Sequence, residues 1–320
     1  MPQPPLLRRS ARPILQPWHG VPWASEMVLN PAIHQEPGDS RIHMLFRSTG
    51  PGPAFAGHAD AFPIYLGYAW SDDGGETWTP DLRRPALAPR LRETFEDLFV
   101  TGEDGSRQLD YANGCIEDPR LFSIDGVLYL SAACRIFPPG PYWLHDDPMQ
   151  CAPGWARESG APGGMAVRKN LTVSVLYRVD LSALKTGNYD QAFTYLGPLT
   201  DPERSDNRDV FLFPERMRID GRAQYLMIHR PKNPGAYRTG LTTPSLFLAC
   251  ADTLSGLPQN PSRDELLAEP LFPWEGNRIG GSTPPLRIDQ GRWLLPYHGK
   301  QDDRVGYTQS FLILKEVEDR

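Results

Sequence analysis

Short apolar segments separated by turn residues recur along this chain, and many alternate apolar with polar positions, as half-buried β-strands do. Three segments share one design, in which a strand, a tight turn of the Asp-Gly type and a second strand follow one another. They span residues 119–135, 214–230 and 285–300, and a looser copy with a longer turn spans 30–47. Such matched hairpins predict a repeated unit of antiparallel strands.

Each hairpin is followed by at least one further strand candidate, at 64–71, 170–181, 245–254 and 306–314. A unit of several short strands that repeats every 70 to 95 residues or so is typical of a β-propeller. The pattern predicts an all-β propeller with four clear units, while a closed ring of this length would need a fifth unit that the pattern does not delimit. A two-sheet β-sandwich is the alternative, but it gives no reason for the matched hairpins.

The propeller is expected to form one domain over residues 16–320, after a loose N-terminal segment at 1–15. Residues 71–78 match the Asp-box pattern S-x-D-x-G-x-T-W, a hairpin turn common in propeller blades. We assign that turn a structural role only.

Composition excludes several other classes of protein. The 320 residues include 34 prolines and 29 glycines, too many for a fold of long helices, and a net charge of −6 leaves no basic excess for nucleic acid. No stretch of 18 apolar residues predicts a membrane span, and the N-terminus lacks the apolar core of a secretory signal, so we expect a cytoplasmic protein. The 4 cysteines and 7 histidines are scattered without ligand spacing, so neither a disulfide framework nor a metal site is expected.

Polar residues stand at matched ends of the repeated hairpins, where the innermost strands of a propeller converge on its axis. They are Asn30, Glu117, Asp118, Asp209 and Glu215 before or within first strands, and Arg47, Arg135, His229, Arg230, His298, Asp302 and Asp303 after second strands. Carboxylates and amides accept hydrogen bonds from sugar hydroxyls, and arginines orient anionic groups by bidentate contacts. A funnel with these residues therefore suits a polyhydroxylated substrate.

Several ordered motifs resemble those of glycoside hydrolase family 130, the β-mannoside phosphorylases and related mannosidases. They are E-D-P-R at 117–120, N-R-D-V-F-L-F-P-E at 207–215, H-R-P at 229–231, I-G-G-S-T-P-P at 279–285 and Y-H-G at 297–299. The resemblance runs from about residue 30 to about residue 314 and implies a five-bladed β-propeller.

The resemblance also implies a reaction and a set of residues. Asp118 would be the general acid in an inverting cleavage of a β-mannosidic bond, its proton passing through a sugar hydroxyl. Asn30, Arg47 and Asp302 would hold the mannosyl unit, with Asp303 as an alternative to Asp302. The same motifs place Glu117, Tyr297 and His298 among the substrate-binding residues.

The attacking group is either phosphate or water. Phosphorylases need a cationic pocket and no base, whereas inverting hydrolases need a carboxylate base. The resemblance places Arg168, Arg208 and His229 at phosphate-binding positions, with Arg178 and Arg204 as candidates for one more arginine. These basic residues favour phosphorolysis with inorganic phosphate as co-substrate and no cofactor. A hydrolase with Glu215 as base is the alternative, and a propeller that binds sugar without chemistry is a more remote one.

Two loops are candidates for the acceptor side of the funnel. The insertion at 137–167 carries Tyr142, Trp143, His145, Asp146, Asp147 and Trp155, and the loop at 50–62 carries Phe55, His58 and Asp60. Long irregular loops in compact domains are often functional. The insertion would shape the acceptor subsite, or else serve as surface decoration or an oligomer contact. A homo-oligomer stays open, because family members often associate.

Overall fold

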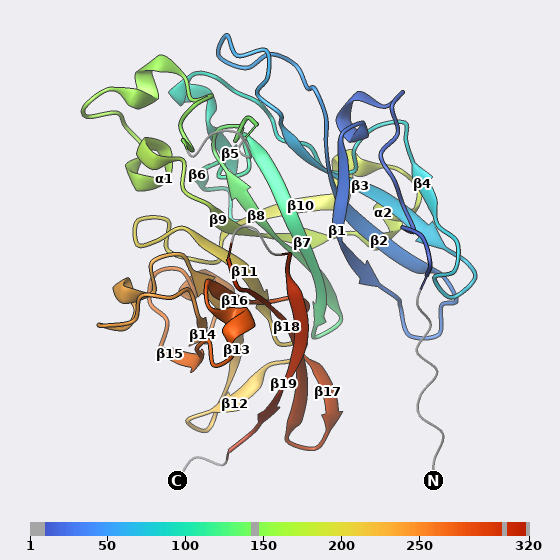
Figure 1. Cartoon of the computed structure of the whole chain (residues 1–320), viewed down its shortest axis with the longest axis vertical. Coiled ribbons are helices and arrows are strands. Elements are labelled where there is room, and N and C mark those ends of the chain that lie inside the picture. Colours follow the sequence, from blue (N-terminus) through green and yellow to red (C-terminus); the bar gives the residue numbers. More distant parts are fainter. Residues whose placement is uncertain (1–9, 142–146, 303–305, 318–320) are drawn as a thin grey trace.

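The computed structural model describes residues 10–141, 147–302 and 306–317, which form consecutive antiparallel sheets arranged as propeller blades (Figure 1). In Figure 1 the blades follow the colour order of the chain, from blue blade I through green blade II to gold and red blades III and IV. Blade I comprises β1 (Met27–His34), β2 (Ile42–Thr49), β3 (Ile64–Ser71) and β4 (Thr79–Asp81). Blade II comprises β7 (Cys115–Ile124), β8 (Val127–Arg135), β9 (Val173–Val179) and β10 (Phe193–Pro198).

The C-terminal half of the chain forms the other two blades. Blade III comprises β11 (Asn207–Leu212), β12 (Met217–Ile219), β13 (Arg222–Pro231), β14 (Leu246–Ala251) and β15 (Arg263–Ala268). Blade IV comprises β16 (Arg278–Gly281), β17 (Leu286–Asp289), β18 (Arg292–Lys300) and β19 (Thr308–Lys315). Because β16 and β17 both pair with β18, they act as one interrupted strand, and blade IV is three strands wide.

The other hairpin and the α-helices are short and lie in loops. The hairpin β5 (Phe99–Thr101) and β6 (Arg107–Leu109) lies between blades I and II in the chain, whereas the helices α1 (Gly164–Lys169), α2 (Leu181–Lys185) and α3 (Tyr189–Ala192) lie in the loops of blade II. None of the helices in the described part of the chain is long and apolar enough to cross a membrane.

The four predicted hairpins are confirmed, and their turns have the conformation that the residues favour. Asp125-Gly126 and Asp220-Gly221 both have positive φ at their two central positions (52° and 78°, 49° and 76°), as a type I′ turn requires. Two predicted strands are shorter than expected. The strand predicted at 170–181 is β9 at 173–179, which begins late because Asn170 adopts a left-handed conformation (φ 46°) at the end of α1. The strand predicted at 245–254 is β14 at 246–251.

Apolar side chains pack between successive blades. Leu45, Leu66, Leu130 and Val175, all fully buried, join blades I and II. A second core around Phe211 continues from blade II through blade III to Trp293 and Leu295 of blade IV. Burying one such Leu or Phe side chain stabilises the fold by about 1.5–3 kcal/mol, so the interblade layers hold the ring together.

The beginning of the chain lies against the outer face of blade I. Leu15, Trp18 and Trp23 pack over Met44 and Phe46, with the rings of Trp18 and Phe46 5.9 Å apart. The predicted loose segment at 1–15 lies partly outside the described residues, and residues 10–14 form neither helix nor strand. The Asp-box turn is formed as the pattern predicts, with the Asp73 carboxylate accepting hydrogen bonds from the backbone and side chain of Thr77.

Candidate active site

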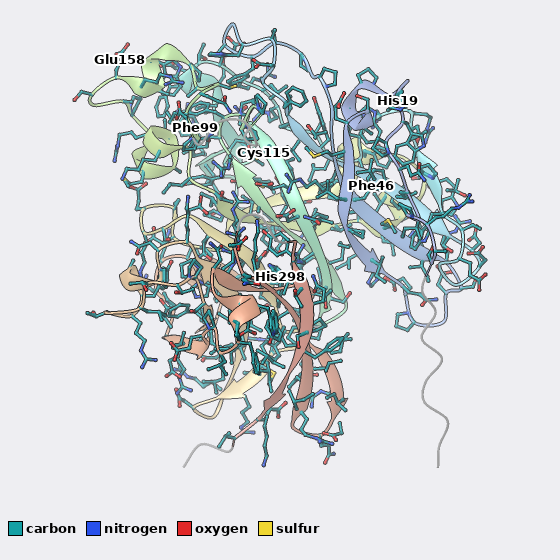
Figure 2. All side chains as sticks on the ribbon, viewed as in Figure 1. His19, Phe46, Phe99, Cys115, Glu158 and His298 are labelled. Carbon is teal, nitrogen blue, oxygen red and sulfur yellow. The ribbon has the colours of Figure 1, made fainter. Side chains whose placement is uncertain are left out.

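A polar cavity of about 880 Å³, called the central cavity below, lies where the innermost strands of all four blades meet. His298, labelled in Figure 2, lies in the middle of the view, where the ribbons of blades II, III and IV approach one another. The charged residues that line the cavity are Arg47, Glu117, Asp118, Arg120, Arg135, Asp147, Lys169, Asp206, Arg208, Asp209, Arg230, Lys232, Arg278 and Lys300. The hydrophobic cores lie between the blades, whereas the cavity where the innermost strands meet is lined mainly by charged and polar residues.

A repeated backbone distortion brings three of the lining residues together. The innermost strands β1, β7 and β11 each carry a β-bulge, and within each bulge one residue has positive φ: Asn30 (47°), Asp118 (53°) and Asp209 (53°). Asn and Asp tolerate this left-handed conformation better than other residues with a side chain, and bulges commonly re-aim side chains beside functional sites. The bulges therefore turn equivalent positions of three successive blades into the central cavity.

Asp118 lies between the first two blades, where cations surround it. Its Oδ1 accepts hydrogen bonds from Asn30 Nδ2 at 2.7 Å and from Arg47 Nη1 at 2.9 Å. Burial raises the pKa of Asp118, but the charges of Arg47 and Arg120 outweigh this effect and hold the pKa below its ordinary value. Asp118 is therefore ionised at neutral pH in this structure.

Arg208 forms ion pairs with two carboxylates at the wall of the cavity. Its guanidinium lies 3.4 Å from Glu117 and 3.5 Å from Asp206, and it donates to Thr172 Oγ1 at 2.9 Å. Burial disfavours its charge, yet Glu117 and Asp206 keep the pKa of Arg208 above its ordinary value. Arg208 is thus a permanent, partly exposed cation held at the cavity wall.

Asp209 is the centre of a second ion-pair cluster, formed by blades II, III and IV. It accepts from Arg230 Nε at 2.6 Å and lies 3.7 Å from Arg120 and 3.5 Å from His298 Nε2. A Cβ added to Gly280 would stand 2.1 Å from the Asp209 carboxylate, so only glycine leaves room for this side chain. Burial raises the pKa of Asp209, but Arg230 and His298 lower it more, and the group is ionised.

The structure brings six of the ten predicted site residues to the cavity: Asn30, Arg47, Glu117, Asp118, Arg208 and His298. It places the other four elsewhere. Alternation along β18 points His298 into the cavity, and Tyr297 is therefore turned to the opposite face, where its hydroxyl donates to Glu275 at 2.6 Å. By the same rule Arg230 lines the cavity while His229 is buried away from it, bonded to Asn207 and Asp264.

Arg168 and Asp302 are both exposed and stand outside the lining. Arg168 lies at the end of α1, and the lining residue there is its neighbour Lys169, since one step along a helix turns the side chain by about 100°. Asp303, the alternative to Asp302, lies outside the described residues. The two candidates for a further phosphate-binding arginine also lie elsewhere: Arg178 pairs with Glu103 and Arg204 with Asp264.

The predicted loops contribute in part. Of the insertion at 137–167, Pro139, Asp147 and Pro148 line the cavity, while Tyr142, Trp143, His145 and Asp146 lie outside the described residues. Trp155 packs against Phe95 and Phe137 beneath the insertion. Phe55 is buried in the same cluster, so the loop at 50–62 supports the insertion rather than the cavity.

Sequence reasoning missed several lining residues, among them Arg120, Lys169, Asp206, Lys232 and Arg278. Arg120 stands two residues after Asp118, and the bulge between them is what returns it to the cavity side. The sequence signal that could have found it is the Asp118-Pro119 pair directly before Arg120, because Asp tolerates the positive φ that this bulge requires. Across the described residues, no cluster of three or more His, Cys, Asp or Glu side chains could hold a metal ion, and all 4 cysteines are free and buried.

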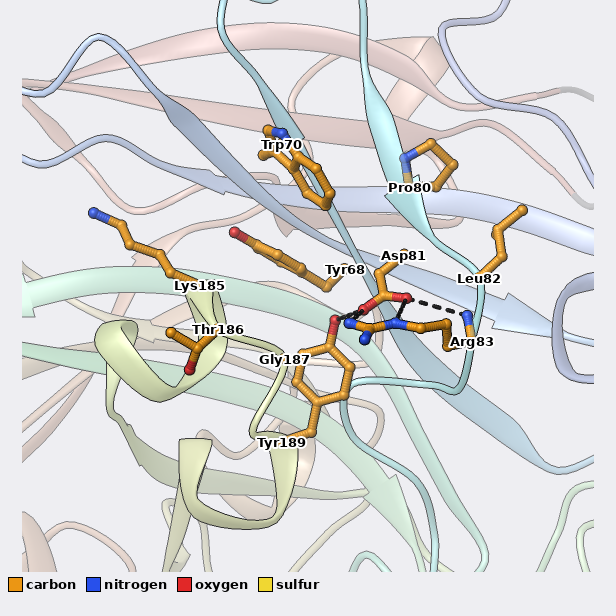
Figure 3. Close-up of a pocket in the computed structure, with 10 residues that line it drawn as sticks. All are labelled: Tyr68, Trp70, Pro80, Asp81, Leu82, Arg83, Lys185, Thr186, Gly187 and Tyr189. Carbon is orange, nitrogen blue, oxygen red and sulfur yellow. Dashed lines mark hydrogen bonds and ion pairs between the residues drawn. The ribbon is translucent and has the colours of Figure 1, made fainter.

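A second hollow, of about 530 Å³, lies between blade I and α2 (Figure 3). Figure 3 shows two of its charged groups paired with each other: Asp81 accepts hydrogen bonds from Arg83 at 2.6 Å and from the Tyr189 hydroxyl at 2.6 Å. A ligand there would meet a carboxylate that is already satisfied. The central cavity is therefore the candidate active site.

Known proteins resemble this chain in sequence and in fold. No family model matches the chain. The 1,2-β-oligomannan phosphorylase of Thermoanaerobacter sp. (strain X514) is 25% identical over 303 residues, which cover 94% of this chain and 73% of that protein. The solved β-1,2-mannobiose phosphorylase from Listeria innocua superposes with a TM-score of 0.55 at 16% identity, covering 95% of this chain and 76% of that one.

A further solved structure comes from work showing that the GH130 family of mannoside phosphorylases contains glycoside hydrolases that target β-1,2 mannosidic linkages in Candida mannan. It superposes with a TM-score of 0.56 at 14% identity and covers 97% of this chain and 79% of that one. The sequence similarity to the Thermoanaerobacter protein indicates a carbohydrate-active enzyme. The solved structures that the chain resembles are five-bladed β-propellers, and the described residues of this chain form four blades of that kind. The similarity of the chain to these mannoside phosphorylases agrees with the resemblance to glycoside hydrolase family 130 that its motifs indicated.

Proposed function

We propose that this protein cleaves β-mannosidic bonds by inverting phosphorolysis and releases α-mannose 1-phosphate. The observation that carries the proposal is the charge of the central cavity. Its described lining holds nine Arg or Lys residues against five Asp or Glu residues. An excess of four positive charges in a partly enclosed cavity attracts an anion such as phosphate.

Two carboxylates of the cavity, Asp206 and Asp209, are poorly suited to be a hydrolytic base. A general base works best when its pKa lies near the operating pH. Cationic neighbours instead lower the pKa values of Asp206 and Asp209 against the effect of burial. Glu215, the base that the hydrolase alternative requires, is exposed and paired with Arg287, outside the cavity lining. Phosphate needs no base, because it is already an anionic nucleophile at neutral pH.

Asp118 is the proposed general acid, and it must carry a proton when the glycosidic bond breaks. Arg47 and Arg120 favour its ionised form in this structure. A phosphate bound near these cations would offset their charge and raise the pKa of Asp118. Phosphate would then supply both the nucleophile and the electrostatic change that lets Asp118 hold its proton. The proton would reach the leaving oxygen through a sugar hydroxyl.

The remaining polar residues would bind the two substrates. Asn30 and Arg47 converge on Asp118 and would hold the mannosyl unit beside it, with Glu117 and His298 completing the wall. Arg208, Lys169 and Lys232 would bind phosphate. The activity of the Thermoanaerobacter relative makes a β-1,2 linkage the first to test.

Phosphorus NMR tests the proposal. The purified protein is incubated with β-1,2-, β-1,3- and β-1,4-linked mannobiose in phosphate buffer, and free mannose is assayed in parallel without phosphate. Formation of α-mannose 1-phosphate, abolished in Asp118→Asn and retained in the exposed control Asp190→Asn, would support phosphorolysis. Free mannose in both buffers would overturn it in favour of a hydrolase. Sugar binding without any product would instead indicate the non-catalytic alternative.

A further inference from the structure

One arginine of the central cavity has no carboxylate beside it among the described residues. Five of the six arginines in the described lining lie within 4.0 Å of an Asp or Glu oxygen; they are Arg47, Arg120, Arg135, Arg208 and Arg230. The sixth is Arg278, which donates to Asn277 Oδ1 at 2.7 Å and to the Tyr307 hydroxyl at 3.0 Å. Both acceptors are neutral, so they fix the position of the guanidinium without compensating its charge.

Arg278 lies apart from the groups proposed to bind the mannosyl unit and the phosphate. Except for His298, those groups belong to blades I to III, whereas Arg278 is the first residue of β16 in blade IV. Arg278 precedes Gly280 by two residues, about 7 Å along the strand, and Gly280 is the residue that adjoins the Asp209 carboxylate. Its partner Tyr307 is 54% exposed. Arg278 therefore stands between the ion-pair cluster and the opening of the cavity, on a wall left for the acceptor sugar, which departs when the glycosidic bond breaks.

The neighbours of Arg278 suit a sugar ring that bears a negatively charged group. Lys300 stands opposite Arg278 in the sheet, and its Nζ lies 5.2 Å from the centre of the Tyr307 ring. A second cation thus adjoins the place where an anion would meet Arg278. Tyr307 adds an exposed ring against which the apolar face of a sugar can pack, and Gln309 adds an amide for sugar hydroxyls.

The charge of the whole cavity leaves room for a second anion beside phosphate. Nine Arg or Lys residues face five Asp or Glu residues in the described lining, an excess of four positive charges. A phosphate group carries about two negative charges at neutral pH. About two positive charges therefore remain when phosphate is bound, and an anionic group on the other substrate would balance at least one of them.

We propose that the acceptor sugar carries an anionic group, a carboxylate or a phosphate ester, and that Arg278 binds this group. The inference rests on the proposed function, because it names the class of sugar that leaves the mannosyl unit in the same cavity. A guanidinium contacts two oxygens of a carboxylate or phosphate at once, which a compact ammonium group does not. Tyr307 is a positioning residue, since its hydroxyl holds the guanidinium in place.

The reverse reaction tests the proposal with free sugars. A hydroxyl oxygen of the acceptor forms a bond to the anomeric carbon of α-mannose 1-phosphate, the bond from that carbon to the phosphate oxygen breaks, and the hydroxyl proton passes to Asp118. The inorganic phosphate that is released is measured. Glucuronate and glucose 6-phosphate are compared with glucose, and mannuronate and mannose 6-phosphate with mannose. We expect kcat/KM to be about tenfold higher or more for a charged sugar than for its neutral counterpart, and the charged sugar that reacts identifies the group as carboxylate or phosphate.

Arg278→Gln should remove this preference while it keeps a side chain that can hydrogen-bond to Tyr307. We expect kcat/KM for the charged acceptor to fall about tenfold or more, and kcat/KM for the neutral acceptor to stay within about twofold. Tyr307→Phe, which keeps the ring, should reduce the preference less. Arg292→Gln is the matched control, because Arg292 also lies in blade IV but is exposed, paired with Asp289 and outside the cavity lining. Circular dichroism verifies that each variant is folded.

Neutral acceptors that react as well as charged ones would overturn the proposal. A folded Arg278→Gln that keeps the preference would overturn it as well. The same holds if the only defect of Arg278→Gln is a higher KM for α-mannose 1-phosphate, since Arg278 would then bind the phosphate rather than the acceptor.

Isothermal titration of the same sugars in saturating phosphate separates this inference from the proposed reaction. If no acceptor reacts, phosphorolysis is contradicted, but a charged sugar should still bind the wild-type protein about tenfold more tightly than its neutral counterpart and lose this advantage in Arg278→Gln. Equal or undetectable binding of charged and neutral sugars would overturn the anionic subsite too.

Discussion

Asn30 donates a hydrogen bond from Nδ2 to Oδ1 of Asp118 at 2.7 Å, and this bond joins the bulges of two successive blades. Each residue holds its side chain there by adopting a left-handed backbone conformation. The bond orients the proposed acid while Arg47 contacts the same oxygen. The proposed acid is thus positioned from a neighbouring blade as well as from its own strand.

Replacing Asn30 with Ala should lower kcat by about 10- to 100-fold. A hydrogen bond to a charged group contributes about 1.5–3 kcal/mol, and 1.36 kcal/mol corresponds to a factor of ten in rate. Steady-state kinetics on the mannobiose that reacts would measure the loss. Asn188→Ala, which removes an exposed amide bonded to Gln191, should leave kcat unchanged. An unchanged kcat in Asn30→Ala would show that Asp118 needs no support from blade I.

The pH dependence of the reaction should vary with phosphate. An acid catalyst is active while protonated, so activity falls as the pH rises through its pKa. Arg47 and Arg120 keep the pKa of Asp118 low in the empty cavity, and bound phosphate should raise it. We expect kcat, measured at saturating phosphate, to fall at a higher pH than kcat/KM for phosphate does. Identical limbs would contradict this coupling.

Substitution of Gly280 by Ala should damage both the site and the fold. The new Cβ would stand 2.1 Å from the Asp209 carboxylate and 2.7 Å from His298, so the ion-pair cluster must shift. We expect at least a tenfold loss of kcat/KM and a destabilisation of about 1–3 kcal/mol, measured by kinetics and urea denaturation. Gly20→Ala, where a Cβ meets nothing within 4 Å, should be close to wild type. Normal activity of Gly280→Ala would mean that Asp209 has no role in the site.

Replacing Asp110 with Asn should stabilise the protein at neutral pH. Asp110 is 3% exposed, and burial raises its pKa to about 6, with only Arg90 at 3.8 Å as a charge partner. Ionising it in the folded state therefore costs free energy that grows as the pH rises above about 4 and is complete above about 6.

Asn keeps an acceptor for the Ala112 amide but carries no charge. The variant should gain about 2 kcal/mol in the free energy of unfolding at pH 7 and nothing at pH 4. Urea denaturation at both pH values measures the difference. An equal gain at pH 4 and 7 would show that packing, rather than ionisation, is responsible.

Much of the fold was predictable because it depends on local pattern. The turns at Asp125-Gly126 and Asp220-Gly221 need residues that accept positive φ, and alternating apolar positions define the strands on either side. The same kind of hairpin pattern, at residues 285–300, predicted blade IV. What the pattern lacks is information on which blade faces meet, and so the two cores between the blades appear only in the structure.

The site was predictable at the bulges and unpredictable along the regular strands. Asn30 and Asp118 were found because polar residues stood where strands begin. Because side chains alternate along a strand, only one residue of each neighbouring pair can face the cavity, as in His229-Arg230 and Tyr297-His298. The register decides which one, and each bulge upstream shifts the register by one residue. Arg168 and Lys169 pose the same problem at the end of a helix.

The left-handed conformation of Asn30, Asp118 and Asp209 destabilises the backbone while it directs these side chains into the cavity. Glycine adopts positive φ without steric cost, whereas each of these residues is strained by about 1 kcal/mol. Replacement by glycine would relax the backbone at all three bulges and remove the three side chains around which the ion pairs and hydrogen bonds of the cavity are arranged. A less strained backbone at these bulges would therefore come at the expense of the hydrogen bond between Asn30 and Asp118 and of the ion pairs around Asp209.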